Sequence, residues 1–274
     1  MVRKLTVFDD SWLTRARTKK VDDSWVDDGI ATTDAAGRIY LGSLQLWFDR
    51  FPLKSNKQKR ALKIRLESFN TEDHLGAVNE LSWWEFMQRT GSNATPVPVS
   101  TTPRPDFQVE IPAEFFAEVS TLNVSENEKK KFEAGEGIEL NHSETLRRIL
   151  LKVTREKQPQ MSYAANQKRP CVLVLFDYTT WSAFGTQFFR FLADFLLGEK
   201  LGFNGLPAEL SALVYVERKV MEDGRIAISR DRSAIYYNPN AQFPLPVGTF
   251  AALNQFRCQM MAVEPKFTDH WIWL

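Results

Sequence analysis

The chain has 274 residues, of which 43% are hydrophobic and 25% are charged, and its formal net charge is +1. This composition predicts a globular protein with one large core, and the balanced charge neither favours nor excludes a nucleic-acid partner. No run of about 18 apolar residues occurs, which excludes a transmembrane helix and a membrane partner. The chain starts without the apolar core of a secretion signal, and its two cysteines lack metal-ligand spacing, so we expect buried thiols and a cytoplasmic location.

Residues 1–70 are expected to form an N-terminal extension that contains strands and a basic patch. The apolar runs at 39–41 and 44–48 have the composition of a strand, or of a short strand pair around Gly42. A basic cluster follows, made up of Lys54, Lys57, Lys59, Arg60, Lys63 and Arg65. Such a cluster is either a solvated face or a surface that contacts phosphates.

The pattern of residues 73–90 predicts a helix with Asp73 as its N-cap, followed by a loop rich in Gly, Pro, Ser and Thr at 91–104. Helical spacing gathers the apolar side chains of this helix into one arc, formed by Ala77, Leu81, Trp84 and Met87. Glu80 falls inside that arc, where a carboxylate needs a partner, a proton or a metal ion. Glu85 is a second candidate, and an ion pair with an arginine is the alternative for either residue.

Two strands joined by a tight turn are predicted within residues 103–123, because runs rich in Phe, Val and Ile are bounded there by proline. Asp106 opens the first strand, and Glu118 lies inside the second. Side chains alternate along a strand, so Asp106 and Glu118 can meet on one face and at one end of the pair. Two such carboxylates suit Mg²⁺, which prefers oxygen ligands. The alternative is a hairpin whose acids are solvated.

A second amphipathic helix is predicted from residue 144, with an apolar face formed by Leu146, Ile149, Leu150 and Val153. The same spacing puts Lys157 and then Gln160 on the inward face, although Pro159 is expected to kink or end the helix first. An inward lysine needs an anion to meet, or else it snorkels past the edge of the sheet. Basic side chains off the apolar face can follow a phosphate backbone, and they include Arg148, Lys152 and Arg155.

The second half of the chain alternates strands with helices. Residues 171–177 are a continuous apolar run, which predicts a strand buried on both faces. The further expected elements are a helix at 181–198, strands at 211–220 and 226–237, a short helix near 248–261, and a C-terminal tail at 261–274. Together these elements predict an α/β (α+β-like) domain over 71–260, with a mixed central β-sheet and flanking helices.

The order of elements around the hairpin is specific. An acidic helix precedes a strand pair that carries Asp106 and Glu118, and a helix with Lys157 and a buried strand follow. This order resembles the PD-(D/E)xK superfamily of restriction-endonuclease-like nucleases over roughly residues 73–180. The resemblance implies a restriction-endonuclease-like core, in which Glu80, Asp106 and Glu118 bind Mg²⁺ (or Mn²⁺).

In that superfamily, a lysine in an E-x-K spacing positions and activates the attacking water. Here the lysine position holds Ser120. Some members carry the lysine on the following helix instead, and Lys157 stands where such a residue is expected, with Gln160 as a supporting residue.

The resemblance implies a Mg²⁺-dependent nuclease, most simply a DNA endonuclease of a bacterial (antiphage) defence or mobile-element system. The nucleic acid, expected to be DNA, would contact Arg148, Lys152 and Arg155, and the chain would act alone, as a homodimer or with a partner subunit. A second hypothesis, favoured by Ser120, is a catalytically inactive nuclease-like fold that binds nucleic acid or a protein. A third is an unrelated α/β protein whose apolar C-terminal features mark an assembly interface.

Overall fold

The computed structural model describes residues 6–18, 35–122, 142–177, 188–196, 205–257, 260–263 and 269–274. Parts of the helix expected at 181–198 and of the C-terminal tail lie outside these ranges, and so does Cys258. The other cysteine, Cys171, is a buried free thiol, as expected.

A mixed central sheet organises the fold, as the sequence predicts. Its strands lie in the order β1 (Asn93–Pro96), β2 (Phe107–Ile111), β3 (Phe115–Leu122), β4 (Cys171–Asp177), β5 (Ala212–Val216), β8 (Ala234–Tyr237), β9 (Asn254–Arg257) and β10 (Met260–Val263). The predicted hairpin is the antiparallel pair β2–β3, whereas β3, β4 and β5 run parallel to one another. The sheet therefore joins a hairpin edge to a parallel centre.

Strand β4 lies at the centre because every residue of it is buried. Val172, Val174 and Phe176 face one hydrophobic cluster, and Leu173 and Leu175 face another on the opposite side of the sheet. Alternation along the strand thus sends its apolar side chains into two cores, which gives the molecule three layers.

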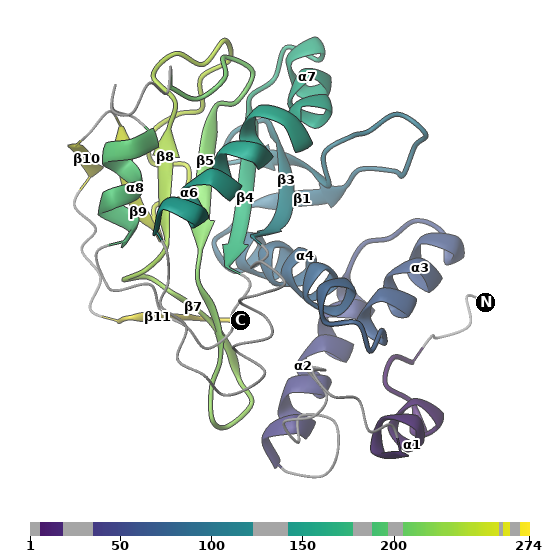
Figure 1. Cartoon of the computed structure of the whole chain (residues 1–274). Helices are drawn as coiled ribbons and strands as arrows, with labels where there is room; N and C mark the ends of the chain where they lie inside the picture. Colours follow the sequence, from purple (N-terminus) through teal and green to yellow (C-terminus); the bar gives the residue numbers. More distant parts are fainter. Residues whose placement is uncertain are drawn as a thin grey trace.

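One face of the sheet is covered by helices that follow the hairpin: α6 (His142–Leu151), the π-helix η1 (Lys152–Glu156), α7 (Gln158–Asn166) and α8 (Phe188–Leu196). The other face packs on α4 (Thr71–Arg89), which also contacts α2 (Ala35–Arg50) and α3 (Asn56–Leu66). Figure 1 shows α6 and α8 in front of the sheet, whereas α2, α3 and α1 (Asp10–Thr18) gather beyond α4.

The strands predicted within residues 39–48 are wrong, because this segment forms the middle of α2. Its buried side chains, Tyr40, Leu44 and Trp47, recur at helical spacing and pack into the core shared with α4. Gly42 sits in the exposed part of the helix and does not break it. A short apolar run fits a strand and a helix equally well, and tertiary packing decides between them.

The helix predicted at 73–90 is confirmed as α4, but the predicted N-cap, Asp73, is wrong. The N-cap is Asn70, whose side chain accepts a hydrogen bond from the backbone N–H of Asp73 in the first turn. A buried chain of contacts fastens α4 to the helices before it. His74 Nδ1 lies 2.7 Å from the carbonyl oxygen of Leu66, and its Nε2 lies 2.9 Å from the hydroxyl of Tyr40. One ring nitrogen donates and the other accepts, so a neutral imidazole satisfies both neighbours.

The long strands expected at 211–220 and 226–237 each divide in two. Their outer halves form a separate small sheet in the order β11 (Trp271–Trp273), β7 (Ile226–Ser229), β6 (Arg218–Val220). Residues at the C-terminal end of the chain thus pair with β7. The helix predicted near 248–261 is also wrong, because this region holds turns and the strands β9 and β10.

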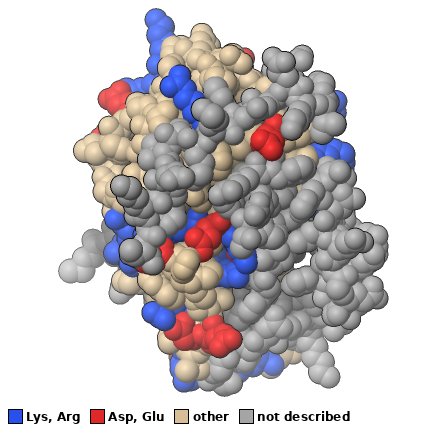
Figure 2. All heavy atoms as spheres, turned by 90° about the vertical axis from the view of Figure 1, so that its left-hand side faces the viewer, with Lys and Arg blue, Asp and Glu red and all other residues tan. Residues whose placement is uncertain are grey.

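The surface offers a mixed pattern of charge on the side that carries α8 and β10. On the described part of the face in Figure 2, Lys and Arg side chains lie beside Asp and Glu side chains. Within the ranges that the structure describes, no helix has the length and apolar character needed to cross a membrane.

Candidate active site

Asp106 and Glu118 meet across the β2–β3 pair. Phe107 is paired with Ala117 in the antiparallel register, so the residue before Phe107 lies opposite the residue after Ala117. The Oδ2 atom of Asp106 accepts a hydrogen bond of 2.8 Å from the backbone N–H of Val119. The two carboxylates therefore share one end of the hairpin, as strand alternation predicts.

Lys157 reaches the same place from the helical layer. Its Nζ lies 2.6 Å from Oε1 of Glu118, whose side chain is only 5% exposed. The backbone N–H of Lys157 bonds to the carbonyl of Lys152 at 3.0 Å, which is the wider turn of a π-helix. Pro159 then occupies the first turn of α7, where its missing N–H costs no helical hydrogen bond. The helix thus ends before Pro159, which is one of the two outcomes expected from the proline, and the Lys157 side chain reaches the buried Glu118.

Glu80 comes to this region from α4, where it pairs with Arg65 of α3. Arg65 Nη1 donates to Oε2 of Glu80 at 2.8 Å, and the Glu80 side chain is 17% exposed. The arginine alternative considered for an inward acid on this helix therefore applies to Glu80. It applies also to Glu85, which pairs with Arg50 and Arg89.

The three carboxylates interact through their charges. Burial raises the pKa of Asp106 well above its usual value, and the charges of Glu118 and Glu80 raise it further. Burial also raises the pKa of Glu118, and the Lys157 ammonium opposes that rise. The second carboxylate oxygen of Glu118 is buried and has no hydrogen-bond partner among the described residues. Bringing the three carboxylates together thus disfavours the charged forms of Asp106 and Glu118, an effect that a bound cation would relieve.

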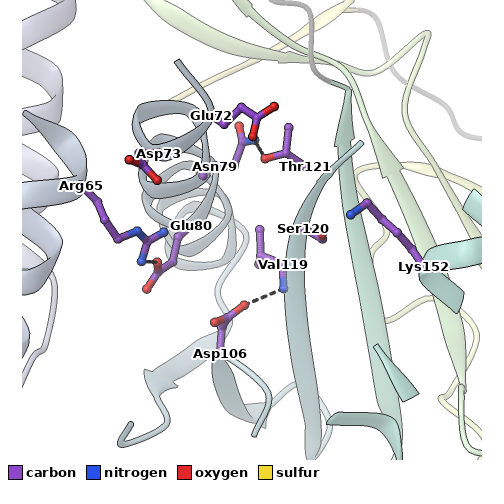
Figure 3. A pocket seen from close by; sticks show the side chains of 11 residues that line it. Arg65, Glu72, Asp73, Asn79, Glu80, Asp106, Val119, Ser120, Thr121 and Lys152 are labelled. Carbon is purple, nitrogen blue, oxygen red and sulfur yellow. Dashed lines mark hydrogen bonds and ion pairs between the residues drawn. The ribbon is translucent and has the colours of Figure 1, made fainter. Parts of the chain in front are cut away.

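A cavity of about 310 Å³ opens beside these acids, and we refer to it as the polar cavity. It is lined by Arg65, Glu72, Asp73, Gly76, Asn79, Glu80, Asp106, Val119, Ser120, Thr121 and Lys152. Figure 3 shows Arg65 and Glu80 pointing toward each other on one side, while Lys152 enters from the opposite side. Anionic and cationic side chains thus line the polar cavity from both sides.

The remaining predicted residues are divided between the cavities and the surface. Ser120 and Lys152 line the polar cavity, although Lys152 also pairs with Glu156 at 3.1 Å. Gln160 lines a second cavity, which shares Asp106 with the first. The other two predicted phosphate contacts, Arg148 and Arg155, are not among the residues that line either cavity.

Sequence reasoning missed a chain of hydrogen-bonded side chains at the wall of the polar cavity. Arg218 is buried, and its Nε donates to Oδ1 of Asn79 at 3.1 Å. Asn79 Nδ2 in turn donates to the hydroxyl of Thr121 at 2.9 Å. The first bond joins α4 to β6 across 139 residues of sequence, and the second joins α4 to β3 across 42 residues. Contacts between such distant residues cannot be predicted from a local sequence pattern.

The donor set suits a hard divalent cation, because all the candidate ligands are carboxylate oxygens and one of them is buried without a partner. Asp106, Glu118 and Glu80 would hold such an ion. As they stand, no three His, Cys, Asp or Glu side chains of the described residues are grouped closely enough to share a metal. Glu80 is turned toward Arg65, so it would have to exchange that partner for the ion.

The chain matches no family model, no curated protein and no solved structure. A function must therefore be inferred from the chemistry of the site.

Proposed function

We propose that the chain is a metal-dependent phosphodiester hydrolase, a nuclease that uses Mg²⁺ or Mn²⁺. The observation that carries this proposal is the convergence of Asp106, Glu118 and Lys157 from separate elements, with Lys157 Nζ 2.6 Å from Glu118. Glu80 joins them through its effect on the pKa of Asp106. Acids gathered in one place with raised pKa values are typical of sites that hold a cation or move protons.

Each side chain has a role in this chemistry. When bound, Mg²⁺ supplies a Lewis acid that activates water and neutralises charge on the reacting phosphate. Asp106 and Glu118 would hold the ion, with Glu80 as a further ligand. Lys157 would orient the attacking water or stabilise the negative charge that develops on the leaving oxygen. Arriving from the helix, this lysine supplies the ammonium group that Ser120 cannot provide.

The finer form of the proposal is a DNA endonuclease acting in the cytoplasm, as part of a bacterial defence or mobile-element system. Lys152 supports a nucleic-acid substrate, because its ammonium lies on the wall of the polar cavity where a phosphate backbone would pass. A homodimer or a partner subunit would enlarge the protein surface that contacts the nucleic acid around the site.

A second candidate is a nuclease-like fold that binds nucleic acid without cutting it. The pairing of Glu80 with Arg65 favours this alternative, because it keeps one of the three acids away from a shared ion. The two candidates differ in one measurable property, which is metal-dependent cleavage.

The test is cleavage of plasmid DNA, single-stranded DNA and RNA with Mg²⁺ or Mn²⁺. Wild type is compared with Asp106→Asn and Glu118→Gln, and Glu110→Gln serves as the matched control. Glu110 is an exposed acid on β2, the strand that Asp106 precedes, and it bonds only to Asn93 in the described contacts.

We expect metal-dependent cleavage by wild type and by the control, and its loss in both site variants. Cleavage that survives Asp106→Asn would assign the activity to another site or to a contaminant. Mg²⁺ binding that is lost in the site variants, without any cleavage by wild type, would favour the binding-only fold.

A further inference from the structure

A second cavity lies next to the polar cavity, between α3 and the loop that connects β1 to β2. Its volume is about 300 Å³, and it shares Arg65, Glu80 and Asp106 with the polar cavity. We refer to it as the proline-lined cavity, because Pro96, Pro98, Pro103 and Pro105 all contribute to its wall. A phosphate bound through a metal ion at the shared acids would therefore have this cavity directly beside it.

The wall of the proline-lined cavity combines apolar residues with polar and charged ones in similar measure. Leu53 and Leu62 contribute apolar surface in addition to the prolines. Gln160 lines the cavity, and its Oε1 is buried with no hydrogen-bond partner among the described residues. An unpaired buried acceptor is costly, which favours a turn of the Gln160 side chain toward any ligand that brings an N–H donor into the cavity. Arg104 adds a flat guanidinium group, which lies 5.4 Å from the centre of the Tyr163 ring.

We propose that the proline-lined cavity binds a single unstacked nucleobase next to a phosphate bound through the metal ion that Asp106 would hold. The proposal rests on the nuclease function proposed above, and it names the part of the substrate that the site selects. The proline and leucine side chains in the wall suit the face of a base, and the guanidinium plane of Arg104 suits stacking. Gln160 lines the cavity, and turning its amide toward the base would let the unpaired Oε1 accept a hydrogen bond from a base edge, which would let the site distinguish bases.

The size of the cavity determines which nucleic acids can enter. About 300 Å³ lies at the lower end of the range for small-molecule pockets, so the cavity has room for one nucleoside but not for stacked base pairs. A base inside a duplex must leave its stack to enter, whereas an unpaired base enters directly. The substrate class is therefore nucleic acid with an unpaired nucleotide beside the scissile phosphate, such as a single strand, a flap or a mismatch.

The experiment first measures binding of the four deoxynucleoside 5′-monophosphates to the full chain with Mg²⁺, by calorimetry or saturation-transfer NMR. Ala61→Trp is the blocking variant, because Ala61 lies on the exposed side of α3 and lines the cavity. An indole there fills the cavity without entering the core. Ile64→Trp is the matched control, because Ile64 is 70% exposed on the same helix and lines neither cavity.

We expect wild type and Ile64→Trp to bind the nucleotides with the same affinity. Ala61→Trp should bind them at least about tenfold more weakly, given the usual contribution of base stacking. Gln160→Leu should bind with a smaller difference between the four bases. Equal binding by Ala61→Trp and Ile64→Trp would overturn the proposal.

Cleavage separates this proposal from the nuclease function. Wild type should cut a single-stranded oligonucleotide faster than its duplex, and Ala61→Trp should lose that preference while binding Mg²⁺ normally. If cleavage depends on Asp106 but is the same in Ala61→Trp, the base-binding cavity is wrong and the nuclease stands. If Ala61→Trp blocks nucleotide binding by a chain that cuts nothing, the cavity is supported and the nuclease function fails.

Discussion

Protonation of His74 should loosen the attachment of the N-terminal helices at acid pH. Burial lowers the pKa of His74 from 6.5 to about 3, because the ring is completely enclosed between Tyr40 and Leu66. Below pH 6.5 the unfolded chain binds a proton at this side chain that the folded chain does not bind. The free energy of unfolding must therefore fall as the pH falls from 6.5 toward 3.

The size of this effect follows from the pKa difference. Each pH unit within that window removes about 1.4 kcal/mol, so roughly 2 kcal/mol is lost on going from neutral pH to about pH 5. The loss acts on the contact that docks Leu66, at the C-terminal end of α3, against α4. Arg65 is the neighbour of Leu66, so its contact with Glu80 should weaken together with that attachment.

The assay is urea unfolding of wild type and His74→Gln at about pH 7.5 and about pH 5. Other groups titrate over the same range in both proteins, and taking the difference between the two proteins cancels them. Wild type should lose roughly 2 kcal/mol more than His74→Gln between the two pH values. A stability difference between the proteins that is the same at both pH values would refute the reasoning.

Three further predictions concern the charged groups. Lys157→Met should lower the cleavage rate by about a hundredfold or more in kinetic assays, while calorimetry should show that Mg²⁺ still binds. Equal cleavage rates in the variant and wild type would show that the lysine takes no part in the reaction. Arg65→Gln should release Glu80 and tighten Mg²⁺ binding by roughly two- to fivefold in calorimetry, because half-exposed ion pairs contribute little; weaker binding would show that Arg65 helps to build the site. Burial raises the pKa of Glu217 from 4.5 to about 7, so the folded chain keeps a proton there that the unfolded chain releases. Glu217→Gln should therefore gain stability relative to wild type as the pH rises from 4.5 to 7, by at most roughly 3 kcal/mol in urea unfolding, and a constant difference would contradict this.

The parts of the fold that local patterns specify were predictable. The hairpin carrying Asp106 and Glu118, the helix around Glu80 and the strand at 171–177 each have a clear period and clear boundaries. The inward position of Lys157 followed from the spacing of the apolar face before it. These features depend on the chain within a few residues, which is the range over which a sequence pattern acts.

The features that were missed depend on packing between distant segments. The run at 39–48 carries Tyr40, Leu44 and Trp47 at helical spacing, but its apolar composition also fits a strand, and packing against α4 decides for the helix. The strand expected at 211–220 divides at Glu217, whose backbone N–H bonds to the Ser233 hydroxyl of a returning segment. The ion pair between Arg65 and Glu80 joins α3 to α4, and it could not be predicted because it depends on how these two helices pack against each other.

The π-helical turn before Lys157 has a consequence for chains of different length. A single wide turn of this kind accommodates one additional residue while the helix beyond it keeps its orientation. Within this turn, Arg155 is exposed and lines neither cavity, so it is the residue whose removal we expect to disturb the site least. Its removal would return the turn to α-helical geometry and leave the amine of Lys157 beside Glu118. Chains that are one residue shorter at this point can therefore preserve the same site, and an alignment that places a gap there need not mean that the lysine has been lost.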